Sequence, residues 1–200
     1  MSRFRWLTHM PLVPLLVACA TTAPVPDNHY YRLLASRAPL TDDSPPIRGV
    51  LKVDAIKAFG IYRERALLYT LESRPEQLRQ HRYHYWIDTP SRLIRNHLIE
   101  FLRYRRVAEQ VVGSELVMTA DLRLKLTLKQ FERIITPGAA DRVRVVLDAV
   151  IIDADGKPVK IASYQREKIA AGASISASVN AVTMGLNEIY TEIADDLRAY

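Results

Sequence analysis

Cys19 is the residue whose type and position point most directly to a chemical modification. It is the only cysteine among the 200 residues, and it follows Leu16-Val17-Ala18. This order of a long apolar, an apolar and a small residue before a cysteine looks like a bacterial lipobox. In such a segment diacylglycerol is transferred to the thiol, and a peptidase then cuts between Ala18 and Cys19. Because it has no second cysteine, the chain cannot form an intramolecular disulfide.

The residues before Cys19 have the pattern of a cleavable signal peptide, which we assign to residues 1–18. Two cations, Arg3 and Arg5, precede an apolar run that extends to Ala18. The run is interrupted by a histidine and two prolines, and it is shorter than the about 20 apolar residues that a membrane-spanning helix needs.

Residues 19–29 are expected to form a lipidated tether, because they contain two prolines and no apolar periodicity. Bacterial lipoproteins carry three acyl chains, and about 0.8 kcal/mol per buried methylene makes such an anchor effectively permanent. Ala20 stands where an aspartate commonly retains a lipoprotein at the inner membrane. We therefore expect attachment to the outer membrane, on its periplasmic face, with residues 30–200 forming one domain.

The charge excludes one class of partner. The formal net charge of +6 falls to +4 when residues 1–18 are removed, because that segment holds two arginines and no acid. The remaining cations are spread among 22 acids, whereas nucleic-acid binding favours a clustered basic face. We expect no nucleic-acid partner.

The histidines do not have the spacing of a metal site. His81 and His84 are three residues apart on an expected strand, so alternation places them on opposite faces. His97 has no partner on its helix, and His29 lies in the tether. We expect no metal ion.

The remaining polar residues do not form a catalytic or cofactor-binding pattern. Ser174 and Ser176 lack the second glycine and the preceding strand of a hydrolase elbow, and we interpret either Ser174 or Ser176 as a helix cap. No glycine-rich turn precedes a helix, as a phosphate loop requires. The acids Glu64, Glu72 and Glu76 lie in polar surroundings, where carboxylates are solvated. We expect no enzymatic activity and no cofactor.

Two clusters leave alternatives open. The first, Arg82-Tyr83-His84-Tyr85-Trp86, is either a core tryptophan with tyrosines at the sheet edge or an aromatic binding platform, and ordinary strand composition favours the core interpretation. The second consists of arginines around the first helix, which form either a solvated face or a contact with an acidic partner or anionic lipid. We select Arg92 and Arg95 for that contact. The full set is Arg92, Arg95, Arg103, Arg105 and Arg106.

Apolar alternation predicts a series of strands. In residues 120–128 apolar and polar residues alternate strictly, and the change of phase at Phe131 predicts a bulge or the end of the strand. Residues 143–151 are apolar on both faces, which places them in the centre of the sheet or under a cover. Asp155-Gly156 predicts a tight hairpin, so the last three strands form an antiparallel meander. The expected strands are 30–34, 50–56, 66–71, 81–87, 120–128, 143–151 and 159–169.

Two amphipathic helices complete the predicted fold. The first begins at Thr89-Pro90, where Thr89 can cap free amides and Pro90 suits the first helical position. The second spans about residues 174–199, with apolar residues three or four apart. Both should pack on one face of a largely antiparallel sheet, which is a single-domain α+β architecture.

In this order, the segments resemble a known family, the ABC-type transport auxiliary lipoproteins of the PqiC/YmbA-like group. The resemblance includes the lipobox and the long C-terminal helix, and it covers almost the whole chain after the signal peptide. The matching segments are Tyr30-Tyr31-Arg32-Leu33, Val53-Asp54-Ala55-Ile56, Leu67-Leu68-Tyr69, Tyr85-Trp86-Ile87-Asp88-Thr89-Pro90 and Asp153-Ala154-Asp155-Gly156.

The resemblance implies a non-enzymatic component of an MCE-type lipid transport system. In such a system an inner-membrane ABC transporter or permease and a periplasmic MCE protein move lipid between membranes. The lipoprotein would dock this conduit at the outer membrane and would assemble as a homo-oligomeric ring. Two other classes remain open: an accessory lipoprotein of outer-membrane assembly or lipopolysaccharide export, and an envelope hydrolase whose site is built from scattered residues.

Overall fold

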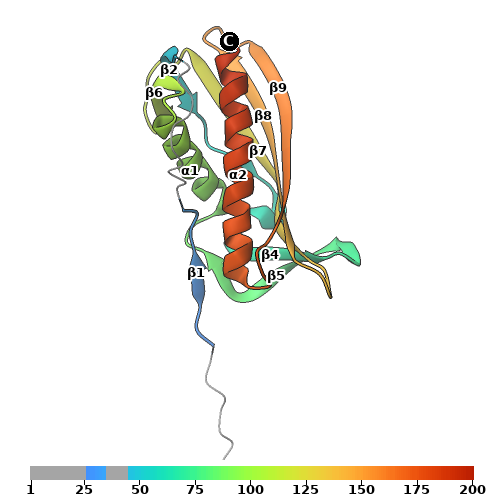
Figure 1. Ribbon diagram of the computed structural model, residues 1–200. Coiled ribbons are helices and arrows are strands. Elements are labelled where there is room, and N and C mark those ends of the chain that lie inside the picture. Colours follow the sequence, from blue (N-terminus) through green and yellow to red (C-terminus); the bar gives the residue numbers. More distant parts are fainter. Residues whose placement is uncertain (1–25, 35–44) are drawn as a thin grey trace, which may run out of the picture.

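The computed structural model describes residues 26–34 and 45–200. The expected signal peptide, the lipobox with Ala18 and Cys19, and most of the expected tether therefore lie outside the described residues. Within them, nine strands form one sheet, and two α-helices lie together on one side of it (Figure 1). This confirms the predicted single-domain α+β architecture. None of the described helices is long and apolar enough to cross a membrane.

The longest strand pairings are antiparallel and involve the last three strands. β7 (Leu122–Ile135) pairs with β8 (Arg142–Asp153) along one edge, and β8 pairs with β9 (Pro158–Ile169). The predicted meander is confirmed, and β8 lies between two strands, as its apolar residues on both faces indicated. At the second hairpin Asp153 Oδ1 accepts hydrogen bonds from the amides of Asp155 and Lys157, and Gly156 adopts a φ of 81° that glycine allows without strain.

The other edge of β7 pairs in parallel with three shorter strands in succession. These are β2 (Ile47–Val53), β3 (Lys57–Ala58) and β4 (Ala66–Leu71). A 3₁₀ helix, η1 (Gly60–Arg63), connects the last two. The sheet is therefore antiparallel on one side of β7 and parallel on the other.

Three further strands extend this parallel side. β5 (Arg74–Trp86) pairs antiparallel with β4, and β1 (His29–Tyr31) pairs in parallel with β5. β6 (Ala108–Gly113) pairs in parallel with β2. Sequence analysis did not predict β6. It buries Val111 and Val112 in succession and so lacks the alternation that marks a half-buried strand.

A bulge in β7 keeps its apolar residues on the helix-covered face. The register with β8 shifts between Leu128 and Gln130, which brings Phe131 to the buried side although it has the parity of the polar positions. The change of phase in the sequence therefore marks a bulge inside a longer strand, because β7 continues to Ile135.

The helices begin where the sequence predicted, with one difference in capping. In α2 (Ile175–Arg198) Ser174 accepts a hydrogen bond from the amide of Ala177 at 3.1 Å, which confirms its role as a cap. In α1 (Pro90–Tyr104) Thr89 occupies the N-cap position, but its hydroxyl makes no capping bond. The expected Thr89 cap is therefore wrong. The backbone amide of Thr89 instead donates to Asp88 Oδ1 at 2.7 Å.

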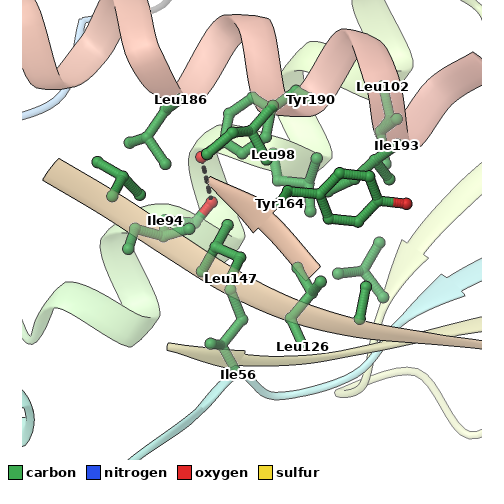
Figure 2. Close-up of a cluster of buried hydrophobic side chains, with 14 of the residues drawn as sticks. Ile56, Ile94, Leu98, Leu102, Leu126, Leu147, Tyr164, Leu186, Tyr190 and Ile193 are labelled. Atoms are coloured by element: carbon green, nitrogen blue, oxygen red, sulfur yellow. Dashed lines mark hydrogen bonds between the residues drawn. The ribbon is translucent and has the colours of Figure 1, made fainter. Parts of the chain in front are cut away.

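The core lies between the two helices and the face of the sheet that they cover. Leu126 of β7 and Leu147 of β8 project toward Leu186 and Ile193 of α2, and all four are essentially inaccessible to solvent (Figure 2). The hydroxyl of Tyr190 on α2 donates to the carbonyl of Ile94 on α1 at 3.1 Å. This buried bond joins the two helices and satisfies a polar group that would otherwise be costly to bury.

Candidate functional site

Three histidines meet where the chain enters the folded domain. The rings of His29 on β1 and His84 on β5 are stacked with centroids 5.0 Å apart, and the ring of His81 lies 6.1 Å from that of His84. The hydroxyl of Tyr31 lies 3.0 Å from His84 Nδ1. This corrects two expectations, because His81 and His84 share one side of β5 and His29 belongs to a strand.

An irregularity in β5 brings the two histidines together. Ala66 of β4 is opposite Tyr85, and Leu68 is opposite Gln80, so a step of two residues in β4 matches a step of five in β5. Within that segment Tyr83 has a φ of 62°. Side chains alternate between faces only along a regular ladder, and this bulge breaks the alternation between His81 and His84.

His81 is the most perturbed member of this histidine cluster. Its ring lies 4.4 Å from that of Tyr69, and its Nε2 has no hydrogen-bond partner. Burial, and next the positive charge of Arg133, lower the pKa of His81 from 6.5 to about 4. The narrow crevice that His81 lines with Trp86 has a volume of about 20 Å³, which is enough for one water molecule. The imidazole is therefore neutral at neutral pH.

The cation beside His81 is fixed by a buried ion pair. Arg133 on β7 donates through Nε to Asp141 Oδ2 at 3.1 Å and through Nη2 to the carbonyl of Ala173 at 2.6 Å. The amide of Ala170 donates to the carbonyl of Asp141 at 2.8 Å. These bonds join β7 to the segment that precedes α2, so the charge of Arg133 has a structural role.

The histidine cluster does not have the geometry of a metal site. The stacked rings of His29 and His84, with an interplanar angle of 17°, turn their faces toward each other. Among residues 26–34 and 45–200, no group of three or more histidine, cysteine or acidic side chains could hold a metal ion. The arrangement instead fastens β1 to β5 through aromatic stacking and a hydrogen bond.

The aromatic segment that ends β5 belongs mainly to the core. Trp86 is buried, and its ring lies 5.1 Å from that of Phe131. Tyr85 is half-buried with its ring 5.9 Å from that of Tyr30, and Tyr83 is exposed. The interpretation of a core tryptophan is confirmed, whereas the expected edge position of Tyr85 is wrong, because Tyr85 pairs with Tyr30 on β1 and with Ala66 on β4.

The structure separates the two arginines that were selected for a partner contact. The Arg92 side chain is 70% exposed and pairs with Asp88 Oδ2 at 3.1 Å, one helical turn earlier. Arg95 is only 8% exposed, and its Nη2 donates to Glu115 Oε2 at 2.5 Å. The expectation that Arg95 lies on an accessible face is therefore wrong, whereas Arg92 is accessible.

The ion pair of Arg95 with Glu115 joins α1 to the segment after β6, and we call this pair the Arg95 clamp. A Cβ atom on Gly113 would lie 2.3 Å from Arg95 Nη2, so a larger residue at position 113 would force the ends of the Arg95 and Glu115 side chains to shift. The hydrogen bond from Arg95 lowers the pKa of the Glu115 carboxyl to about 2, which keeps that partner ionised. Sequence periodicity could not reveal this role, because the glycine and the glutamate belong to a distant segment.

Other residues of α1, and Arg105 just after its C-terminal end, also make intramolecular contacts. Arg103 Nε donates to the carbonyl of Val111 at 2.8 Å, and the guanidinium of Arg105 lies 5.5 Å from the centre of the Phe101 ring. His97 is buried, with Nε2 3.1 Å from the carbonyl of Leu34. α1 therefore holds both β6 and the segment that follows β1.

Charge reversal should have different effects at the two arginines. We expect Arg95→Glu to lower the free energy of unfolding by about 1–3 kcal/mol, because it places a carboxylate at a buried position, beside the acidic Glu115, and removes the bond between the two side chains. Arg92→Glu should change it by no more than about 0.5 kcal/mol, since exposed ion pairs contribute little. Denaturant unfolding of both variants measures the difference, and equal stabilities would contradict the Arg95 clamp.

The stability of the folded domain should decrease in acid partly because of His81. Above pH 6.5 the imidazole is neutral in both states, and between about 6.5 and 4 the unfolded chain takes up a proton that the folded His81 does not. The free energy of unfolding should therefore fall over this range. His81→Gln should reduce the slope, while His84 and His97, whose pKa values burial also lowers, retain part of it. Identical slopes for the two proteins in denaturant titrations would exclude this role.

Comparisons with known proteins agree with the architecture. The sequence matches the family described as ABC-type transport auxiliary lipoprotein component over residues 31–194. No curated protein sequence matches the chain. The crystal structure of protein XCC0632 from Xanthomonas campestris is similar with a TM-score of 0.72 and 14% identity, over 82% of this chain and 91% of that one.

A crystal structure of an uncharacterized protein has a TM-score of 0.68 and 15% identity, over 86% of this chain and 99% of that one. At such identities the likeness shows the fold alone. The family match extends over nearly the whole sheet and both helices, from β1 into the last turns of α2. The chain therefore belongs to the ABC-type transport auxiliary lipoprotein component family.

Proposed function

We propose that this protein is a non-enzymatic adaptor of an MCE-type lipid transport system, anchored in the outer membrane by lipid on Cys19. One observation carries the proposal: a domain that belongs to a family of transport auxiliary lipoproteins follows a lipobox, Leu16-Val17-Ala18-Cys19. The adaptor would dock a periplasmic MCE protein, and through it an inner-membrane transporter or permease, at the outer membrane.

The way the chain enters the domain supports an anchoring role. The expected tether ends at β1, which is joined to β5 by parallel pairing and by the contacts of His29 and Tyr31 with His84. The amide of Ile87 donates to the carbonyl of Tyr31 at 2.9 Å, and His97 holds the carbonyl of Leu34. The segment nearest the anchor is thus attached to both β5 and α1.

Arg92, one of the exposed arginines of α1, is available for contact with a partner. Arg92 lies in the first turn of α1, a few residues after the point where Ile87 meets β1, and its side chain faces solvent. Its guanidinium can form a bidentate contact with a carboxylate of an MCE protein. Family membership favours transport over outer-membrane assembly, lipopolysaccharide export or hydrolysis. We also propose that the protein acts as a homo-oligomer, with a ring as the expected form.

Loss of the thiol should abolish anchoring. We expect Cys19→Ser to accumulate as unlipidated precursor, because the acyl transfer has no other cysteine to use. Labelling cells with a palmitate analogue and separating the membranes measures both lipidation and location. Equal labelling of Cys19→Ser and the wild type would end the lipoprotein proposal, and wild-type protein in the inner membrane would contradict the outer-membrane assignment.

Binding to the MCE protein should depend on Arg92. We expect the full-length lipoprotein, purified in detergent, to bind an MCE-family protein of the same organism, and Arg92→Glu to weaken this binding at least tenfold by placing like charges together. Lys125→Glu is the matched control, because Lys125 is also an exposed cation but lies on the uncovered face of β7. Binding can be measured by biolayer interferometry.

Two outcomes of the binding measurement would contradict the proposal. If no MCE-family protein binds the wild type, the transport assignment is wrong. If Arg92→Glu binds as tightly as the wild type while its unfolding midpoint is unchanged, MCE docking occurs elsewhere and Arg92 is simply solvated.

A further inference from the structure

β9 presents a long open edge. It spans twelve residues, Pro158–Ile169, and among the described strands only β8 pairs with it. α2 lies on the helix-covered side of β8 and β9, so it leaves this edge open (Figure 1). An open edge carries a row of unpaired backbone N–H and C=O groups, which form a template for another strand.

The devices that usually protect such an edge are confined to the start of β9, where the register shifts beside Pro158 and the Tyr200 hydroxyl donates to the carbonyl of Val159 at 2.6 Å. Natural edge strands are commonly protected by free lysines, prolines or bulges. Lys160 and Lys168 are bound to Asp196 and Glu188 of α2 at 3.0 and 2.6 Å. The sequence has no proline between positions 159 and 169, and the pairing of residues 160–169 with β8 is regular.

The remaining charges of β9 are also engaged within the molecule. Arg166 donates to Glu192 on α2 at 2.5 Å and to the carbonyl of its neighbour Gln165 at 2.8 Å. Glu167 accepts from Arg142 and Arg144 on β8 at 2.5 and 2.8 Å. Residues 160–169 therefore form a regular stretch of edge without an unpaired charged side chain, and the Arg166 guanidinium must turn away from the Gln165 carbonyl when that carbonyl pairs with another strand.

Two isoleucines near the ends of this edge are unusually exposed. Ile161 is 74% and Ile169 is 71% exposed. Ile161 is opposite Val150 and Ile169 is opposite Arg142 in the register with β8, so both isoleucines lie on the uncovered face of the sheet. Each isoleucine is four residues from Gln165. When a second copy of β9 runs antiparallel to the first with the two Gln165 residues opposite each other, the isoleucines of the two strands therefore coincide.

We propose that β9 pairs antiparallel with β9 of a second copy of this chain, about a twofold axis at Gln165. Ile161 of each copy then lies opposite Ile169 of the other, and Ser163 lies opposite Glu167. On the helix-covered face, Ala162 lies opposite Lys168 and Tyr164 opposite Arg166. No like charges face each other, and directly opposite side chains are the pairs that stabilise a sheet.

Other registers are less favourable. A twofold axis at Ile161 or at Ile169 brings one isoleucine pair together and leaves the second pair exposed. A shift of two residues from the Gln165 register places Ile161 opposite Glu167 in one direction, and in the other places Ile169 opposite Ser163 and Ile161 beyond the end of the partner strand. A shift by an odd number moves the isoleucines to opposite faces. Only the axis at Gln165 buries all four isoleucines of the two copies.

The resulting contact joins two copies and then closes. It is isologous, because the same strand contributes from both sides, whereas a cyclic ring of more than two copies needs a head-to-tail contact. If the protein also forms a ring, this pairing cannot be the contact that repeats around it. It would instead join a subunit of one ring to a subunit of a second ring, or join subunits two by two within one ring. It does not depend on the MCE partner, whose binding is measured separately.

Cysteine crosslinking tests the register. Opposite Cα atoms in an antiparallel pair lie about 4.5–5.5 Å apart, which a disulfide can bridge. We expect the full-length lipoprotein with Gln165→Cys to form a crosslinked dimer under mild oxidation in detergent. A mixture of Ile161→Cys and Ile169→Cys proteins with different tags should form the mixed dimer. The parent with Cys19 alone and Lys125→Cys are the controls.

A charge exchange tests the contact without cysteines. We expect the double variant Ile161→Lys/Ile169→Lys to weaken self-association at least tenfold, because lysines then face each other. Ile161→Lys/Ile169→Glu should associate within about threefold of the wild type, since each lysine then faces a glutamate across the axis. Both positions are exposed, so unfolding midpoints should match the wild type. Sedimentation equilibrium of the full chain in detergent gives the association constants.

The proposal is overturned by any of three results. The first is a wild-type protein that stays monomeric at high concentration. The second is crosslinking of Lys125→Cys as efficient as that of Gln165→Cys. The third is equal association of the two double variants, which would indicate that copies meet through another surface.

Discussion

β7 has to satisfy backbone hydrogen bonds along both of its edges, and the positions of most other elements follow from this requirement. β8 pairs with it along one edge. The other edge is shared by β2, β3 and β4, each of which covers a different part. These three short strands must therefore lie end to end, and η1 and the turns between them are positioned as a consequence. The bulge between Leu128 and Gln130 then lets a single long strand keep its apolar residues under both helices.

The helices are attached to this sheet by two kinds of interaction. Apolar residues of α2, such as Leu186 and Ile193, fill the space above β7 and β8. At the margin, cations of β9 meet acids of α2, as Lys160 meets Asp196 and Lys168 meets Glu188. Burial provides most of the driving force, whereas the charged pairs define the position of the helix along β9. Because these cations point toward α2, the edge of β9 remains uncharged.

The end of the molecule nearest the expected anchor is organised differently. There the chain is attached by small polar and aromatic contacts, from the stacked rings of His29 and His84 to the bond between His97 and Leu34. A short parallel strand such as β1 has few hydrogen bonds of its own, so these side chains supply part of its attachment. The proposed roles thus divide the molecule: β1 and α1 face the anchor and the transport partner, and β9 faces a second copy of the chain.

Local sequence patterns determined the regular part of this protein. Strict alternation located β7, a run of apolar residues on both faces located β8, and the turn at Gly156 indicated the return strand β9. Helical periodicity located α1 and α2. Each of these signals depends on neighbouring residues in one regular element. The tertiary structure decided the rest: the bulge that brings His81 to His84, the burial of Arg95 beside Gly113, and the existence of β6. These features arise where distant segments meet and local periodicity is interrupted. Likewise, nothing within the sequence of β9 shows that one of its edges has no partner, because an edge is defined by the strands that are not beside it.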